Sequence, residues 1–351
     1  MTLFSTPEVI ARVEGRTGRL TLNRPKALHA LTTEMCQALT SALMAWRETE
    51  AIDLVLIDHA GDRGFCAGGD IRAMAEHGAH DPKAGAEFFL HEYRMNDLLQ
   101  RYPKPVAAVM DGVTMGGGVG LSAYATYRVA TERTLLAMPE TGIGLFPDIG
   151  AGWLLARLPG EIGTWMALTG ARLKAADLLY LNLCTHHVPG DRLDRLKAAL
   201  LTNPHEARRI LARFHDDPGL APLSGKQSAL DSVFEHDTVE AILAALRAGS
   251  SWAREQAAIL GTKSPTSMKV ALRELRGARE QPTFGAEMLL EYRLACRLIA
   301  SHDFQEGVRA VVIDKDNAPR WSPARLEDVS QAALDALFAP FDDQAEWTPL
   351  P

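Results

Sequence analysis

The sequence predicts an α/β fold in which strands and helices alternate, followed by a region built almost wholly of helices. Through about the first 190 residues, short apolar segments with strand-like composition recur between longer segments with helical period. From about residue 191 onward the pattern is helical, with breaks at clusters of proline and glycine. We therefore expect a core over residues 1–190 that holds the functional site, and a helical region over residues 191–351 that packs on it.

Composition limits the classes of function. With 47% hydrophobic residues in a chain of 351, the protein can bury a sizeable core. A net charge of −7 without a long basic run argues against nucleic acid as a partner. No stretch approaches ~18 uninterrupted apolar residues and the first residues lack a signal-peptide pattern, so we expect no membrane partner. The four cysteines are scattered, which predicts reduced thiols, no zinc site and a cytoplasmic location.

The N-terminal segments read in order as strand, strand, helix and strand. Residues 9–13 and 19–22 have strand composition on either side of a glycine turn. Thr32 is a suitable N-cap for the amphipathic helix that follows it. The continuous apolar run over residues 54–58 predicts a buried strand.

Two glycine loops follow apolar strands and precede helices. The first loop covers residues 64–70, where Asp70 is placed to cap the next helix. The second loop, residues 116–120, comes after the apolar strand 105–110. Glycine lets the backbone approach a ligand closely, and N–H groups at a helix start are unpaired. Two such loops could therefore bring two N–H donors onto one oxygen atom.

Two carboxylates on a stiff loop, Glu140 and Asp148, are the main candidates for catalysis. Each directly follows a proline in the segment 137–150, which is otherwise apolar and glycine-rich. Partial desolvation there raises a carboxyl pKa above ~4, as a general base or nucleophile at neutral pH requires. Glu92 lies among aromatic residues of a predicted helix over 82–102 and is a third such acid. The alternative interpretation is that all three are ordinary solvated acids.

These motifs resemble those of the crotonase (enoyl-CoA hydratase/isomerase) superfamily. The matching stretches are Leu22-Asn23-Arg24-Pro25, Phe65-Cys66-Ala67-Gly68-Gly69-Asp70 and Met115-Gly116-Gly117-Gly118. The resemblance implies a ββα-spiral core, a CoA thioester substrate and an oxyanion hole formed by the backbone N–H groups of Ala67 and Gly117. It also implies substrate contacts from the two glycine loops and from the first strand break, at Gly68, Gly69, Asp70, Gly116, Arg24 and Lys26.

Within that superfamily the chain is similar to a hydrolase subgroup along nearly its whole length. The matching stretches include residues 138–141 and 144–148. The similarity implies hydrolysis of a short, branched β-hydroxyacyl-CoA thioester in valine degradation, with 3-hydroxyisobutyryl-CoA as the expected substrate. Glu140 would either attack the carbonyl or deprotonate a water. Asp148 would hold the substrate hydroxyl or help the thiolate leave, and Glu92 would meet the hydroxyacyl end. No metal or redox cofactor is expected, and the chain is compatible with a homo-oligomer.

Other functions are weighed against this one. Hydratases of the superfamily carry a glutamate just after the triple glycine, where this chain has Gly120, so an enoyl-CoA hydratase or isomerase is one alternative. A non-catalytic CoA-binding protein is another. A nicotinamide-dependent dehydrogenase is a third, because residues 118–123 satisfy G-x-G-x-x-[GA] and Glu140 follows about twenty residues later. Residues 302–306 could offer metal ligands, but no second ligand cluster accompanies them.

Overall fold

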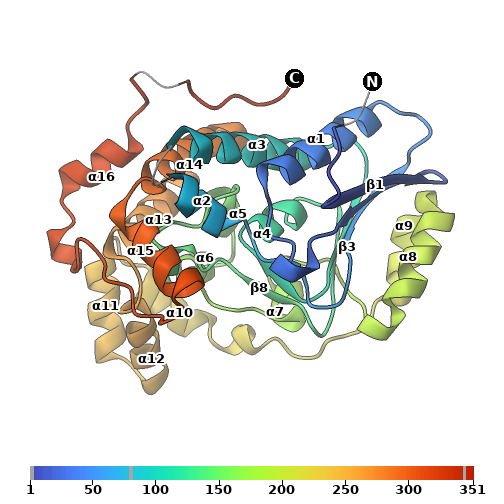
Figure 1. Ribbon diagram of the computed structural model, residues 1–351. Coiled ribbons are helices and arrows are strands. Elements are labelled where there is room, and N and C mark those ends of the chain that lie inside the picture. Colours follow the sequence, from blue (N-terminus) through green and yellow to red (C-terminus); the bar gives the residue numbers. More distant parts are fainter. Residues whose placement is uncertain (1–3, 79–81, 343–344) are drawn as a thin grey trace.

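The computed structural model describes residues 4–78, 82–342 and 345–351 and contains a six-stranded sheet (Figure 1). The first two strands are antiparallel and the others run parallel to the second. In spatial order the strands are β1 (Val9–Glu14), β2 (Thr17–Leu22), β3 (Leu54–His59), β5 (Val106–Met110), β7 (Tyr127–Ala130) and β9 (His186–His187). The strands predicted at 9–13, 19–22 and 54–58 are confirmed.

A second, smaller parallel sheet contains β4 (Gly64–Cys66), β6 (Val113–Met115) and β8 (Leu135–Ala137). Successive turns of the chain place one strand in each sheet, as β3 and β4, then β5 and β6, then β7 and β8. This is the predicted ββα spiral. Strand β4 lies within the segment that we assigned to the first loop, and β6 lies just before the second loop in residues that we assigned to no element, since three residues are too few to show a period. Both glycine loops therefore begin at the carboxyl ends of strands in one sheet.

The first four α-helices lie within residues 33–122. They are α1 (Thr33–Arg47), α2 (Ile71–Gly78), α3 (Pro82–Gln100) and α4 (Gly117–Ser122). The Thr32 side chain accepts from the Met35 N–H at 3.2 Å, which confirms the predicted N-cap. The Asp70 carboxylate accepts from the Ala73 N–H at 3.2 Å, so it caps α2 as predicted. Helix α3 packs against α1 on one side and α14 on another, and thereby carries its polar residues into the interior.

Helices dominate the rest of the chain. They are α5 (Ala151–Leu155), α6 (Ile162–Thr169), α7 (Ala175–Tyr180), α8 (Leu193–Thr202), α9 (Ala207–Phe214), α10 (Gln227–Phe234), α11 (Val239–Ala248), α12 (Ser251–Leu260), α13 (Pro265–Ala278), α14 (Phe284–Leu298), α15 (His302–Val308) and α16 (Gln331–Phe338). A π-helix, Arg309–Ile313, extends α15. Among the described residues, no helix is long and apolar enough to span a membrane.

The hydrophobic core is not divided at residue 190. One cluster of buried apolar side chains extends from the first strands to Trp347, and contains residues of α13 and α14. A second, smaller cluster lies beneath α8 and α9, which pack on the six-stranded sheet away from the main helical group (Figure 1). The boundary at 190 stays a prediction.

Candidate active site

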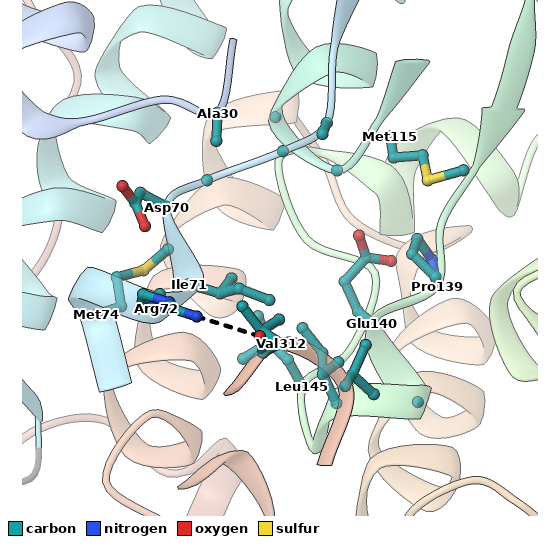
Figure 2. A pocket seen from close by; sticks show the side chains of 18 of the residues that line it. Ala30, Asp70, Ile71, Arg72, Met74, Met115, Pro139, Glu140, Leu145 and Val312 are labelled. Carbon is teal, nitrogen blue, oxygen red and sulfur yellow. Dashed lines mark hydrogen bonds between the residues drawn. The ribbon is translucent and has the colours of Figure 1, made fainter. Parts of the chain in front are cut away.

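A cavity of about 960 Å³ brings together the residues that the sequence singled out. Its walls come from the two glycine loops, from α2 and α3, and from the loop that carries Glu140 and Asp148. Two segments of the helical C-terminal region complete the walls, at residues 262–263 and 311–319. Figure 2 shows Asp70, Ile71 and Met74 on one side, Met115 and Pro139 on the other, and Val312 between them. The Arg72 guanidinium donates to the Val312 carbonyl oxygen at 3.2 Å and ties the C-terminal wall to α2.

The Glu140 carboxylate points into this cavity (Figure 2). Glu140 begins a short 3₁₀ helix, Glu140–Ile143, where the sequence predicted a loop. The residue is 5% exposed, and its Oε2 atom has no hydrogen-bond partner within the described chain. Burial, and secondarily the charge of Asp148, raises the pKa of Glu140 well above its ordinary value. A buried, unpaired carboxylate of this kind is suited to act as a base or nucleophile.

Asp148 lies on the same cavity in the loop that follows. It is 5% exposed, and its Oδ2 atom accepts from the Tyr93 hydroxyl at 2.7 Å. Burial raises the pKa of Asp148 to about 6, although the Tyr93 hydrogen bond favours the charged form and opposes part of the rise. Tyr93 was not identified from the sequence, because an aromatic residue on a helix face is usually core. An acid with this pKa exchanges protons readily near neutral pH.

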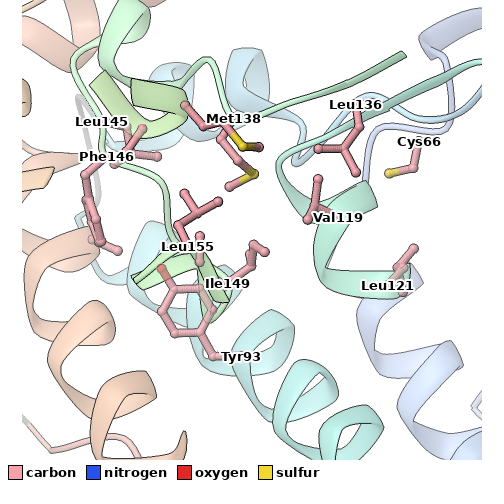
Figure 3. Packing of buried hydrophobic residues seen from close by; sticks show 14 of the residues in the cluster. Cys66, Tyr93, Val119, Leu121, Leu136, Met138, Leu145, Phe146, Ile149 and Leu155 are labelled. Carbon is pink, nitrogen blue, oxygen red and sulfur yellow. The ribbon is translucent and has the colours of Figure 1, made fainter. Parts of the chain in front are cut away.

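The backbone just after Asp148 is strained. Ile149 has φ of 62° and Gly150 has φ of 81°, both in the left-handed region. A β-branched residue there costs about 1–3 kcal/mol and persists only where its surroundings hold it. Figure 3 shows the side chains of Leu145, Phe146 and Ile149 packed among buried hydrophobic residues, with Tyr93 nearby. The packing of this loop therefore fixes where the Asp148 carboxylate points.

Glu92 is brought to the same place from α3. It is 2% exposed, and its Oε1 atom has no hydrogen-bond partner in the described residues. A Cβ atom added to Gly117 would lie 2.5 Å from this Oε1, so the carboxylate adjoins the backbone of the second glycine loop. Burial, followed by the charges of Asp148 and Glu140, raises the pKa of Glu92 well above its ordinary value. The three predicted acids therefore form one cluster, none of them solvated in the ordinary sense.

The two glycine loops lie against each other beside Glu140. A Cβ atom added to Gly116 would lie 3.1 Å from Glu140 Oε1 and 3.3 Å from Gly68 Cα, so only glycine fits at residue 116, where φ is 45°. The Ala67 N–H already donates to the Leu28 carbonyl oxygen at 3.0 Å. This contact argues against Ala67 as an oxyanion donor and corrects that prediction.

Two other N–H groups of these loops remain available. Those of Gly69 and Gly117 have no acceptor within the described part of the chain. Both residues line the cavity, one from each loop. A carbonyl oxygen bound between the loops could therefore accept from both.

The space beside Gly120 is filled by another side chain. A Cβ atom added to Gly120 would lie 2.9 Å from Asn96 Oδ1 and 3.1 Å from the Ile149 Cβ. Asn96 is fully buried on α3, one turn beyond Glu92, and neither of its amide atoms has a partner within the described residues. Asn96 was missed because buried asparagines have no sequence pattern. A side chain at residue 120 has no room here unless Asn96 moves.

The basic residues on the cavity differ from those predicted. Arg24 pairs with Glu8 at 3.0 Å and with Asp70 at 2.7 Å, so its charge is already compensated, whereas Lys26 lines the cavity without an ion pair among the described residues. Besides Arg72, which donates to Val312, four further cations line the cavity and likewise make no ion pair within the described chain: Arg63, Arg172, Lys263 and Lys315. Lys263 interacts electrostatically with Glu140: burial lowers the pKa of Lys263, and the charge of Glu140 opposes that fall.

Two alternative sites lose their basis in the structure. In the dehydrogenase-like motif, a Cβ atom at Gly118 would clash with Cys66, so this glycine serves packing and not a dinucleotide. In the 302–306 segment, Asp303 accepts from Ser264 and Ser322, and Glu306 pairs with Arg309 at 2.8 Å. The described residues do contain a group of three acids that could hold a metal, but it is elsewhere, at Glu274, Glu287 and Glu291.

Comparison with known proteins places this geometry in context. The family model for enoyl-CoA hydratase/isomerase matches residues 17–338. The chain is 42% identical to the mitochondrial 3-hydroxyisobutyryl-CoA hydrolase of Danio rerio, over 96% of this chain and 91% of that protein. It is 41% identical to the mitochondrial 3-hydroxyisobutyryl-CoA hydrolase of Homo sapiens, over 94% and 88%.

Two solved structures share nearly the whole fold. A carnitinyl-CoA dehydratase from Mycobacterium thermoresistibile superposes with a TM-score of 0.93 at 40% identity, covering 98% of this chain and 99% of its own. An enoyl-CoA hydratase from Rhodobacter sphaeroides superposes with a TM-score of 0.89 at 39% identity, covering 97% and 99%. The similarity therefore includes the helical C-terminal region.

Proposed function

The chain belongs to the enoyl-CoA hydratase/isomerase family, and we propose that it hydrolyses the thioester of 3-hydroxyisobutyryl-CoA. The observation that carries this proposal is the buried Glu140 carboxylate, whose Oε2 atom has no hydrogen-bond partner in the described residues and which faces a cavity lined by two glycine loops. The names of the curated relatives support the same substrate. A thioester carbonyl placed between the loops would have Glu140 on its flank and the other two acids at its acyl end.

The first step places the thioester oxygen between the N–H groups of Gly69 and Gly117. As a nucleophile adds to the carbonyl carbon, negative charge develops on that oxygen, and two N–H donors stabilise it. Removing one such donor typically lowers kcat by ~10²–10³, so these two N–H groups carry a large share of the rate.

Glu140 supplies the nucleophile by one of two routes. In the first, its carboxylate adds to the carbonyl carbon, the C–S bond breaks, and water then hydrolyses the mixed anhydride. In the second, it takes a proton from a water whose oxygen adds to the same carbon. Both routes need an anionic Glu140, and the Oε2 atom, which has no hydrogen-bond partner in the described residues, is free to react in either case.

Asp148 and Glu92 act on the two ends of the reacting group. Asp148, with a pKa of about 6, can accept a hydrogen bond from the β-hydroxyl or give a proton to the departing thiolate. Glu92 adjoins Gly117 and meets the hydroxyacyl end. The phosphates of CoA would be bound by the cations without an ion pair, Lys26, Arg63, Arg172, Lys263 and Lys315. The reaction uses water and protein carboxylates alone and needs no resident cofactor.

A hydratase or dehydratase is a second candidate, because the two similar structures bear those names. The contacts of Gly120 disfavour it: Asn96 fills the space that a side chain at residue 120 would take. A CoA-binding protein without turnover is disfavoured by three buried acids around one cavity, since such a cluster is costly and binding alone does not need it.

A panel of thioesters separates these candidates. We expect the wild-type protein to release CoA from 3-hydroxyisobutyryl-CoA, followed with a thiol reagent, much faster than from isobutyryl-CoA, which lacks the hydroxyl. Crotonyl-CoA should lose neither its double bond nor its CoA. Activity confined to hydration of crotonyl-CoA would overturn the proposal, and CoA binding without turnover on any substrate would favour the non-catalytic reading.

We also infer a role in valine degradation and a cytoplasmic location. All four cysteines are free and buried, as in a reducing compartment. The curated relatives are named as mitochondrial, so fractionation of the source cells is the relevant test. A homo-oligomer is compatible with the chain, and light scattering would measure it.

A further inference from the structure

The loop that carries Asp148 is held by an acid from the C-terminal region. Glu291, on α14, accepts from the Gly150 N–H at 2.6 Å and from the Gly152 N–H at 3.1 Å. These two donors lie two and four residues after Asp148, at the start of α5. A carboxylate that accepts from two backbone N–H groups at once fixes the position of the chain between them.

The same peptide is held from its other side. The Tyr124 hydroxyl donates to the Gly150 carbonyl oxygen at 2.7 Å. The Tyr124 ring in turn packs edge-on against Phe284 of α14, with ring centroids 4.8 Å apart. Gly150 follows Ile149, whose left-handed backbone is strained. These contacts therefore hold a loop that would otherwise relax and carry Asp148 with it.

Glu291 is distinguished from its two acidic neighbours by these bonds. Glu274 and Glu287 are fully buried, and their carboxyl oxygens have no donor within the described residues, whereas both Glu291 oxygens do. Burial raises the pKa of Glu274, and contact with Glu291 adds to the rise. Burial, followed by the charge of Glu287, raises the pKa of Glu291 as well, and the hydrogen bonds from the Gly150 and Gly152 N–H groups oppose that rise. Of the three acids, Glu291 is therefore the one whose carboxyl group is hydrogen-bonded to the loop backbone.

We propose that Glu291 is a positioning residue for the hydrolysis, holding the Asp148 carboxylate in the cavity through the Gly150 and Gly152 backbone. This inference rests on the proposed function, because it assigns Glu291 a part in Asp148's action. It also gives the helical C-terminal region a role in the reaction, beyond closing the cavity wall.

The test replaces Glu291 with glutamine, which keeps the size and leaves only one oxygen to accept from the two N–H groups. Loss of one of the two hydrogen bonds to the loop should lower kcat on 3-hydroxyisobutyryl-CoA by about 10- to 100-fold, with KM nearly unchanged. The matched control is Glu287→Gln, on the same helix and equally buried but without a bond to the loop, and it should keep kcat within about 3-fold. Equal losses in the two variants would overturn the proposal.

A double-mutant cycle separates positioning from simple damage to the fold. In the Asp148→Asn background, Glu291→Gln should have little further effect on kcat, whereas a merely structural role would lower it by the same factor in both backgrounds. If Glu291→Gln fails to fold, Tyr124→Phe tests the other side of the clamp and should show the same coupling with Asp148. Independent losses would overturn the proposal.

Two further outcomes are distinct. If the wild-type protein does not turn over 3-hydroxyisobutyryl-CoA, the proposed function itself is refuted, whatever the variants do. A melting temperature that falls on treatment with a chelator, and returns with Mg²⁺, Ca²⁺ or Mn²⁺ in the wild type but not in Glu291→Gln, would identify the three acids as a metal site and overturn the positioning role.

Discussion

Replacing Asp148 with asparagine should raise the thermal stability of the protein at neutral pH while it lowers turnover. Burial holds the pKa of Asp148 at about 6, above the ordinary value of about 3.9. The folded protein therefore binds this proton more tightly than the unfolded chain, and stability is lost as pH rises through this window. Each pH unit between the two values corresponds to about 1.4 kcal/mol, so above about pH 7 the charged carboxylate destabilises the fold by about 3 kcal/mol.

Asparagine removes that charge and still offers an oxygen to the Tyr93 hydroxyl. With an unfolding entropy of about 2.1 cal/mol/K per residue, a gain of about 3 kcal/mol corresponds to about 4 °C in melting temperature for a chain of this length. The gain should shrink below about 1 kcal/mol at pH ~4, where Asp148 is protonated in the folded wild type and about half protonated in the unfolded chain. Calorimetry of both proteins at the two pH values measures it.

Asp58 provides a control of opposite sign. It is fully buried but pairs with Arg19 at 2.8 Å and Lys197 at 3.1 Å, and these charges hold its pKa below the ordinary value. Asp58→Asn should therefore lower stability at neutral pH, and the loss should diminish as pH falls. If Asp148→Asn destabilises the protein at pH ~7.5, or if its gain is the same at pH ~4, the reasoning about Asp148 is refuted.

Two glycine substitutions test the geometry of the cavity. Gly117→Ala places a Cβ 2.5 Å from Glu92 Oε1 and 2.9 Å from Leu31 Cδ1, so kcat should fall by ~10²–10³ as the Gly117 N–H donor and the Glu92 carboxylate move apart. The control is Gly277→Ala, which has nothing within 4 Å of its Cβ and should leave kcat unchanged. Similar steady-state kinetics for the two variants would contradict this prediction. Gly120→Glu should not produce crotonyl-CoA hydration, because the new side chain meets Asn96 and Ile149. The melting temperature of this variant should drop for the same reason. Hydration gained from this single change would contradict our account of the space beside Gly120.

Local patterns in the sequence predicted much of the framework. The strands, the Thr32 and Asp70 caps, the glycine loops and the family resemblance depend on nearby residues or on matched motifs, and each is confirmed. The three acids were also found locally, by their prolines or aromatic neighbours, and the structure brings them to one cavity. Their catalytic roles stay predictions.

The surroundings of the acids could not be predicted in the same way. Lys263 reaches the cavity from a loop more than a hundred residues beyond Glu140, and no spacing rule connects them. The Ala67 N–H was misassigned because its acceptor, Leu28, lies in a separate loop. One feature of the sequence could have indicated Glu291. Glu287 and Glu291 lie four residues apart, on the same face of α14 as its buried side chains, where carboxylates are rare.

The kcat of Glu140→Gln on 3-hydroxyisobutyryl-CoA tests the central claim most directly. Glutamine keeps the size of the side chain but can neither attack the carbonyl effectively nor take a proton from water. We expect kcat to fall by at least ~10²–10⁴, with the affinity for CoA unchanged, while Glu255→Gln, an exposed acid on α12, has no effect. A Glu140→Gln protein that keeps turnover within about 3-fold of the wild type would contradict the account.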